Sequence, residues 1–371
     1  MRFMLKLRKW LAQYNEIYYL IFVIGMGMLA SFGFNSSQTV YKVVFVAGAL
    51  MWALKMVTTN YKFREVVFIG VIFALLGVTL LRNGERMLLI PAMAVVGAKG
   101  VSVRKTFAYG FWSKLAVTVL TMAAAAADII NNVLLSNKKG SVASENFCFG
   151  YAHPNHAYLN LFMMAVMAVV LWKNKMRWYI YIIMTGVMFA FYKLLACRTG
   201  LLVWILAAVA FIVYEFVQNT KFRKLYLSLF AAIPSVMLMI TFVTAFMYQK
   251  GNHIAVRINT LLHDRVSAVA KRLPEIGKIG IGSVHSRPFD NGYFYLIYNY
   301  GIVMAVILLI TVTLAILYLV SKKMDYEAMV LGIVCVYIFM EYAAISSIWN
   351  FTVILIAQFV FAGKGEPKPG Q

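Results

Sequence analysis

Long apolar runs recur along almost the whole of this 371-residue chain, and they limit its fold more than any other feature. Most of them are roughly 17–25 residues long, the length at which an α-helix crosses the hydrocarbon core of a bilayer. A helix is favoured there because it satisfies its own backbone hydrogen bonds without water. We therefore expect an all-α, polytopic integral membrane protein with about twelve transmembrane helices, at about 17–34, 40–57, 66–81, 87–98, 107–127, 156–172, 178–196, 201–217, 225–247, 293–320, 328–343 and 345–362.

The composition agrees with a membrane protein and excludes an ordinary soluble domain. Hydrophobic residues make up 63% of the chain and charged residues 13%. Soluble domains have about 45–50% and about 25% instead. The net charge of +22 would suit a nucleic-acid-binding protein. However, most of the Lys and Arg residues stand in short clusters at alternate ends of the apolar runs, where anionic lipid and the positive-inside bias account for them. We expect no nucleic-acid partner.

The basic clusters also predict the orientation. They indicate a single domain over 1–371 in the cell membrane, with both termini in the cytoplasm. Two extracellular loops are long enough to build a site: 128–152, and 248–291 between the ninth and tenth helices. No internal repeat is evident, so the inverted halves common in transporters are not supported. All five histidines fall at or beyond the outer ends of the helices: His153, His156, His253, His263 and His285.

The loop over 248–291 is the longest polar interruption in the chain. Its start predicts one amphipathic helix that ends at Pro274, because apolar residues recur at the helical period on one face and charged residues occupy the other. The apolar face consists of Ile258, Leu262, Val266, Val269 and Leu273. The glycines that follow (Gly277, Gly280 and Gly282) lack the other residues of a phosphate loop, so we interpret them as a hinge. Basic residues, a carboxylate and a histidine gathered over a membrane suggest a site for an anionic, membrane-bound substrate.

Four polar residues near the outer helix ends each have a structural and a functional interpretation. His153 could cap the helix that follows it, or it could accept a proton. Arg198 could reach phospholipid phosphate by snorkelling, or it could bind a substrate phosphate as a bidentate fork. Arg265 could be an ordinary member of a solvated helix face. Asp290, among basic residues, is either an ion-pair partner or a general base.

The remaining polar residues in apolar surroundings are few. Glu341 and Asn350 lie near the outer ends of the last two spans, where polar side chains are costly and where they could line the same cavity. The three cysteines, Cys148, Cys197 and Cys335, have spacings that are typical of neither a metal site nor a disulfide framework. No cluster of outer carboxylates suggests a metal site, so we expect no metal and no cofactor.

Four short motifs occur in order along the chain: Phe149 to Asn155, Arg198 to Gly200, Asp264-Arg265, and Asp290 to Phe294 with Tyr300-Gly301. In order and spacing they are similar to those of the O-antigen polymerase and ligase superfamily. The resemblance is closest to the Wzy-type repeat-unit polymerases of Gram-positive capsule and exopolysaccharide clusters. Ligases of the superfamily often have a His-Asn pair before the span that follows the large loop. Asp290-Asn291 stands here instead and favours a polymerase.

The resemblance implies an inverting, metal-independent membrane glycosyltransferase with a GT-C-like fold. Such enzymes join oligosaccharide repeat units that are carried on undecaprenyl pyrophosphate at the outer face of the cell membrane. They can act beside a chain-length regulator and a flippase. The two important loop arginines of the family map onto Arg198 and Arg265.

The chemistry of this reaction suits the candidate residues. The pyrophosphate leaving group is anionic and needs preorganised cations, which Arg198 and Arg265 could supply. The attacking sugar hydroxyl benefits from a general base, for which we rank Asp290 first, His153 second and His285 third. The long loop would close over donor and acceptor and exclude water. The residues expected to bind pyrophosphate or sugar are Arg198, Arg265, Arg287, His285, Asn155, Asn291 and Tyr293.

Other functions remain as alternatives. A flippase or transporter of lipid-linked oligosaccharide would also use about twelve spans, but its polar residues should line a central cavity rather than gather at one face. A ligase-like enzyme would transfer polysaccharide to another acceptor, and a sensor or scaffold would have no catalytic site. The asymmetry of the long loops and the histidines favours the polymerase.

Overall fold

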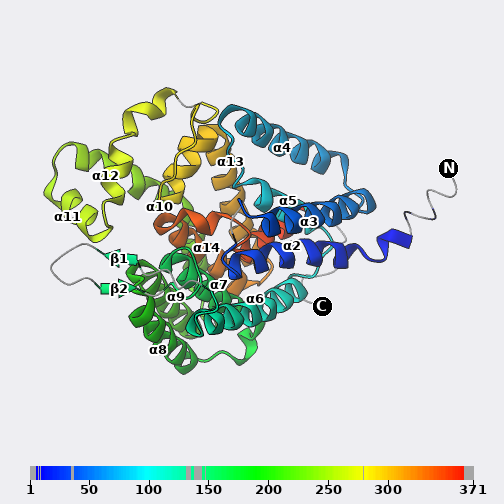
Figure 1. The fold of residues 1–371 in the computed structure, drawn as a ribbon, viewed down its shortest axis with the longest axis horizontal. Helices are drawn as coiled ribbons and strands as arrows, with labels where there is room; N and C mark the ends of the chain where they lie inside the picture. The colour runs from blue at the N-terminus through cyan, green and yellow to red at the C-terminus, as the bar shows by residue number, and fades with distance from the viewer. Residues whose placement is uncertain are drawn as a thin grey trace.

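The computed structural model describes residues 10–34, 37–130, 135–137, 144–146, 148–278 and 280–362, together with Lys6 and Arg8. This part of the chain is predominantly helical (Figure 1). Among the described residues, eight helices are long and apolar enough to cross a membrane by length and composition: α3 Thr39–Thr58, α4 Phe63–Asn83, α6 Val103–Ala126, α7 Pro154–Leu171, α8 Trp178–Leu195, α9 Arg198–Val217, α10 Arg223–Gln249 and α13 Gly292–Ser321.

The other four expected spans correspond to helices of fewer than 18 residues. Helix α2, Asn15–Ser31, has 17 residues, and α14, Asp325–Met340, has 16. Helix α5, Leu89–Gly97, has only nine. The last apolar run is divided into the 3-10 turns η3 Tyr342–Ile345 and η4 Phe351–Val353 and the seven-residue helix α15 Ile354–Val360.

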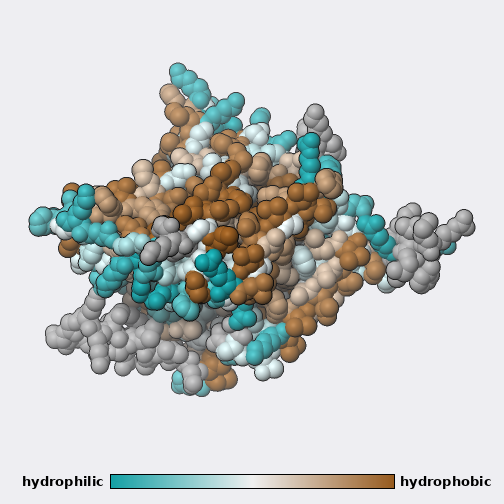
Figure 2. All heavy atoms as spheres, turned by 90° about the horizontal axis from the view of Figure 1, so that it is seen from above, coloured by the Kyte–Doolittle hydropathy of each residue, from teal (hydrophilic) through white to brown (hydrophobic). Residues whose placement is uncertain are grey.

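The bundle has two distinct ends. At one end, here named the loop end, α7, α9 and α13 begin and α10 finishes, and the short helices α11 His253–Leu261 and α12 Arg265–Ala270 follow α10. Figure 1 shows these two short helices on the left-hand side together with the ribbon of β1 Leu135–Asn137 and β2 Ser144–Asn146. In Figure 2, hydrophobic residues cover much of the middle of the visible face, and hydrophilic residues lie around it, at the left edge, at the top and below the middle.

Burial differs sharply between the helices, in a way that suits a membrane protein. Helices α7 and α14 are buried over most of their length, and the rings of Phe162 and Tyr337 pack between them with centroids 4.6 Å apart. Most residues of α3 and α4, in contrast, are not buried, although they are apolar. Apolar surface this extensive is rare on soluble monomers, because water penalises it. It is compatible with contact to lipid.

Ion pairs at the opposite end of the bundle fix the start of α14. Asp325 pairs with Arg223 and accepts a hydrogen bond from Tyr214, and Lys173 Nζ lies 2.6 Å from Glu327 Oε1. Because α14 then runs through the core, its far end delivers the residue that follows it, Glu341, to the loop end.

The chain between α14 and α15 is a buried stretch of irregular backbone. Ser346, Ser347 and Asn350 are all buried there. Asn350 stabilises the irregular path, because its Nδ2 donates to the Ala344 carbonyl at 2.8 Å and its Oδ1 accepts the Thr352 N–H at 2.9 Å. Backbone of this kind is tolerated at membrane depth only where protein surrounds it, since lipid supplies no hydrogen bonds.

The single amphipathic helix expected at the start of the large loop is wrong in one respect: the helix is broken. His263 and Asp264 have φ of +51° and +65°, and they separate α11 from α12. The side chain of Asn259 holds the break, since its Oδ1 accepts the Ser267 N–H at 2.7 Å and its Nδ2 donates to Asp264 Oδ1 at 3.0 Å. Of the predicted apolar face, Val266 and Val269 are buried.

Candidate active site at the loop end

Five segments that are distant in sequence meet at the loop end. His153 precedes α7, Arg198 begins α9, Arg265 begins α12, Asp290 lies just before α13, and Glu341 follows α14. Two contacts each join a pair of these segments. Arg265 Nε lies 3.0 Å from Asp290 Oδ2. Asn155 Nδ2, in the first turn of α7, donates to Glu341 Oε2 at 3.1 Å.

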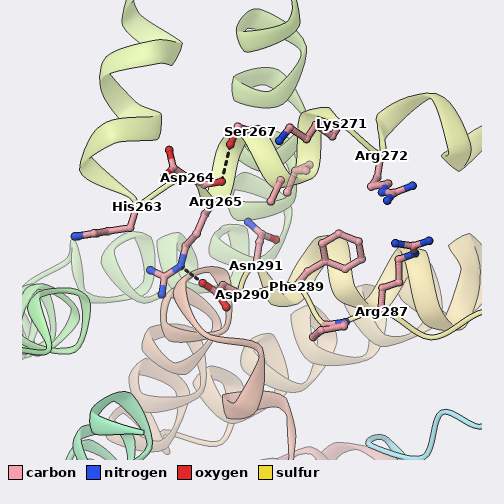
Figure 3. Close-up of a pocket in the computed structure, with 13 residues that line it drawn as sticks. His263, Asp264, Arg265, Ser267, Lys271, Arg272, Arg287, Phe289, Asp290 and Asn291 are labelled. Carbon is pink, nitrogen blue, oxygen red and sulfur yellow. Dashed lines mark hydrogen bonds and ion pairs between the residues drawn. The ribbon is translucent and has the colours of Figure 1, made fainter. Parts of the chain in front are cut away.

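Arg265 is the central cation of this cluster. Its side chain is only 10% exposed, whereas the side chain of Asp290 is 55% exposed. Figure 3 shows the guanidinium of Arg265 reaching from α12 toward Asp290. The Nη1 atom of Arg265 is buried and has no hydrogen-bond partner in the described part of the chain. A buried donor on a charged group is costly when it is unpaired, so this atom is suited to an acceptor from a bound anion.

Glu341 is the second buried charge of the site. It is 6% exposed. Burial raises the pKa of Glu341 to about 7, and the negative charge of Asp290 adds to the rise, while Arg265 and the hydrogen bond from Asn155 oppose it. Near neutral pH this carboxyl therefore exchanges a proton readily. Asp290 pairs with Arg265 directly, and Glu341 lies close enough for the charges of both to act on its pKa.

His153 has the capping role that was one of its two interpretations. Its Nδ1 accepts the Asn155 N–H at 3.0 Å, as expected of an N-cap. Burial lowers the pKa of His153, with Asp290 raising it and Arg265 lowering it further. When Nδ1 of a neutral imidazole accepts a hydrogen bond, the ring proton lies on Nε2, which then donates. In this tautomer Nδ1 is engaged in the cap and Nε2 carries the proton, so neither nitrogen is free to accept a proton from a substrate hydroxyl while the cap is intact.

Arg198 stands beside the cluster rather than within it. Its side chain is exposed at the first position of α9. The thiol of Cys197, one residue earlier, has a pKa raised to about 11 by burial, and the charges of Glu341 and Arg265 also act on it. The start of α9 is therefore close enough to the cluster to experience its field.

The glycine of the Arg198-Thr199-Gly200 motif has a packing role. A Cβ at Gly200 would overlap the ring of Tyr158 in α7. Only glycine lets α7 and α9 approach this closely, and that approach sets the position of Arg198 relative to His153. Gly292 has the same role beside α14, since a Cβ there would lie 2.6 Å from the Ile338 carbonyl oxygen.

Two of the residues expected to bind substrate, Asn291 and Tyr293, have partners within the protein. Asn291 caps α13, because its Oδ1 accepts the Phe294 N–H at 3.0 Å, and its Nδ2 donates to Thr241 Oγ1 at 3.0 Å. Tyr293 is buried, and its hydroxyl donates to the Cys335 carbonyl of α14 at 3.2 Å. Both side chains orient α13 against its neighbours, and a sugar contact by either residue stays a prediction; Asn291 also belongs to the lining of the pocket described next.

A cavity of about 490 Å³, here named the basic pocket, lies between α12 and the segment before α13. Arg265 and Asp290 belong to its lining at one side, and Figure 3 shows Arg272 and Arg287 facing each other at the other. Its lining is His263, Asp264, Arg265, Ser267, Ala268, Val269, Lys271, Arg272, Arg287, Pro288, Phe289, Asp290 and Asn291. The volume is within the range of about 300–1,000 Å³ that is typical of ligand pockets.

The predicted residues Arg287 and His285 occupy different places. Arg287 lines the basic pocket, and its backbone is clamped by Asn299, whose Oδ1 accepts the Arg287 N–H at 2.9 Å. His285 is exposed on the loop outside the lining of this pocket, and its carbonyl accepts a hydrogen bond from Ser283 Oγ at 2.7 Å. The structure thus brings Arg265, Asp290 and Arg287 to one pocket and leaves His285 apart.

Comparison with known proteins adds no identification. No family model, no curated protein and no solved structure matches this chain.

Proposed function

We propose that this protein is a membrane glycosyltransferase that polymerises oligosaccharide repeat units carried on undecaprenyl pyrophosphate. The observation that carries the proposal is the buried guanidinium of Arg265, which pairs with Asp290 and whose Nη1 has no partner among the described residues. The motif resemblance to Wzy-type polymerases supports the same conclusion. In this proposal the loop end faces the outside of the cell membrane, both termini are cytoplasmic, and about twelve segments cross or enter the bilayer in a GT-C-like arrangement.

The proposed reaction is a displacement at the anomeric carbon of the donor sugar. A hydroxyl oxygen of the acceptor forms a bond to this carbon, the anomeric carbon–oxygen bond breaks, and the electron pair leaves with the lipid pyrophosphate. The configuration inverts, because attack and departure occur on opposite faces. Arg265 stabilises the pyrophosphate charge through Nη1, and the exposed guanidinium of Arg198 approaches it from the start of α9. No metal or cofactor is required in this scheme.

The hydroxyl proton passes to a carboxylate. Asp290 is the proposed base, because it is half-exposed and can meet an incoming acceptor at the basic pocket. Glu341 compensates charge: when the anionic pyrophosphate enters, a carboxyl with a pKa of about 7 can take up a proton and limit the repulsion. The reaction then leaves one proton at the site, which returns to solvent through the exposed Asp290.

The deciding experiment is polymerisation of purified lipid-linked repeat units by the purified protein in the presence of EDTA. We expect a ladder of products from the unchanged protein and only single units from Arg265→Ala. Arg257→Ala is the matched control, because Arg257 is an exposed arginine of the same loop, outside the basic pocket. Full-length polymer from Arg265→Ala, or no polymer from Arg257→Ala, would refute the assignment.

A transporter of lipid-linked oligosaccharide is the second candidate. The buried irregular stretch between α14 and α15 favours it, because interrupted helices at membrane depth are typical of transporter binding sites. Movement of labelled lipid-linked oligosaccharide across a proteoliposome, without any increase in its length, would support this candidate over the polymerase. A ligase-like transfer would give a product attached to an added acceptor rather than a ladder.

A further inference from the structure

The side chain of Lys114, in the middle of α6, is fully buried. Its Nζ lies 2.8 Å from Asn160 Oδ1 and 3.3 Å from the carbonyl oxygen of Ile348. The same ammonium lies over the rings of Trp349 and Phe351, 5.9 and 5.3 Å from their centroids. Within the described part of the chain, no carboxylate forms an ion pair with it. A buried ammonium must be compensated, and here neutral oxygens and ring faces compensate it.

The amide of Asn160 is oriented for this role. Its Nδ2 donates to Thr118 Oγ1 at 2.6 Å and to Tyr151 OH at 3.1 Å. Because both amide hydrogens are used, the carbonyl oxygen must face Lys114, and it also accepts from Ser31 Oγ at 3.2 Å. Residues of α2, α6 and α7 thus build one polar network around the ammonium.

The ammonium holds the irregular stretch between α14 and α15. Phe351 of this stretch lies in a notch between two glycines: a Cβ at Gly27 would come within 2.5 Å of its ring, and a Cβ at Gly110 within 3.2 Å. Lys114 binds the Ile348 carbonyl three residues earlier. Trp349, between these two anchors, packs on the ring of His156 with centroids 5.1 Å apart.

The anchored stretch is connected directly to the site. Asn350 Nδ2 donates to the Ala344 carbonyl at 2.8 Å, and Ala344 N–H donates to the Glu341 carbonyl at 3.2 Å. On the other side, the ring of His156 lies 6.1 Å from that of His153. A displacement of residues 348–351 would therefore reach both Glu341 and the start of α7.

We propose that Lys114 is a positioning residue, an internal cation that holds the irregular stretch at residues 346–351 against α6 and thereby sets the geometry of the loop-end site. Its effect on polymer synthesis rests on the proposed function; its effect on the stretch does not. The oxygens and rings around the ammonium form a receptor for a primary alkylammonium. Replacement of Lys114 by alanine removes the fragment that n-propylammonium would supply, so this small cation should restore what the variant loses.

The test follows the accessibility of the stretch in the full-length protein in nanodiscs. Ser347→Cys places a thiol at a buried position. Its rate of maleimide labelling is measured after the labelling of the native cysteines has been subtracted. Lys114→Ala and Lys114→Met should each raise the rate by about tenfold, the size expected for loss of one hydrogen bond to a charged group. Addition of n-propylammonium should lower the rate again in Lys114→Ala but not in Lys114→Met, whose side chain fills the space. Lys193→Ala, at an exposed lysine of α8, is the control.

Polymer synthesis is measured on the same variants. It should fall in Lys114→Ala and recover with n-propylammonium. An unchanged labelling rate in Lys114→Met would overturn the anchoring role. Faster labelling with unchanged polymer length would overturn the link to the site. The two proposals can fail separately. If the labelling rates change as expected but Arg265→Ala still makes polymer, the anchoring role stands and only the proposed function is refuted.

A milder variant keeps the test decisive if the Lys114 variants do not fold. Thr118→Val removes one of the two acceptors that orient Asn160. Labelling at Ser347→Cys should then lie between the rates of the parent and of a freely accessible thiol. A rate equal to that of Lys193→Ala would count against the network.

Discussion

Arg265 and Asp290 form an ion pair in which the cation is buried and the anion is half in solvent, with Nε and Oδ2 3.0 Å apart. Water weakens the attraction of the exposed carboxylate, so this pair contributes little as an isolated salt bridge. The guanidinium still needs an acceptor for its buried Nη1. A phosphate oxygen can accept a hydrogen bond from Nη1 without displacing Asp290 from Nε. The buried guanidinium can therefore bind an anion while it keeps its ion pair.

The geometry of the guanidinium should matter as well as its charge. Arg265→Lys keeps the positive charge but loses the planar fork that serves Asp290 and a phosphate at once. We expect its polymerisation rate to fall by about 10²–10³-fold, as when one preorganised donor to a developing anion is removed. The rate is measured from single-turnover product ladders at saturating donor. If Arg265→Lys works at the rate of the unchanged protein, point charge alone explains the role.

The buried carboxyl of Glu341 predicts a dependence of stability on pH. Its pKa is raised from 4.5 to about 7, so between these values the folded protein retains a proton that the unfolded chain has lost. Stability therefore falls as the pH rises from about 4.5 to about 7, and the contribution of this group is lost above that range. Thermal unfolding in nanodiscs at pH 5 and pH 8 measures the difference. Glu341→Gln should reduce it, and an equal pH dependence in both proteins would contradict the assignment.

Much of the site could be predicted from sequence, because counting apolar runs shows which end of each helix a polar residue occupies. His153, Asn155, Arg265 and Asp290 all adjoin the same end by this count, and the structure gathers them there. From the sequence, Glu341 was expected only to line a cavity with Asn350; its place beside Arg265 and Asp290 was not predicted, since its partners come from α7 and from the large loop. One feature of the sequence could have pointed to Glu341: a carboxylate inside an apolar run is costly, so it usually has a functional role.

Side-chain hydrogen bonds explain why two segments that the apolar pattern predicted to be continuous helices are interrupted in the structure. Leu262 continues the apolar face of the expected loop helix, yet Asn259 binds backbone and side-chain groups beyond it and favours the break at His263. Short polar side chains compete with helical hydrogen bonds in this way. The last apolar run differs from the expected continuous helix for a similar reason. Its hydropathy suits a span, but hydrogen bonds from Asn350 and Lys114 stabilise an irregular path.

His153 can be tested as a cap separately from its role as a base. Its Nδ1 accepts the Asn155 N–H, so His153→Ala should lower the free energy of unfolding by about 1 kcal/mol, as for loss of an N-cap. His153→Asn supplies another capping oxygen and should restore that stability. Polymer synthesis should therefore fall in His153→Ala, which lacks the cap, and be retained in His153→Asn, which keeps it. If His153→Asn is as stable as the unchanged protein but inactive, His153 rather than Asp290 accepts the proton.

Gly200 offers a test of whether the approach of α7 and α9 positions the site. A Cβ there would overlap the Tyr158 ring, whereas a Cβ at Gly186, in the neighbouring helix α8, would meet nothing within 4 Å. Both substitutions to alanine gain the same helix propensity, up to about 1 kcal/mol, so their difference isolates the steric effect. Overpacking of this kind costs about 1–3 kcal/mol. We expect Gly200→Ala to melt at a lower temperature than Gly186→Ala and to lose polymer synthesis, because the overlap moves the start of α9, with Arg198, relative to α7. Equal melting temperatures and equal product lengths for the two variants would show that this close approach has no part in building the site.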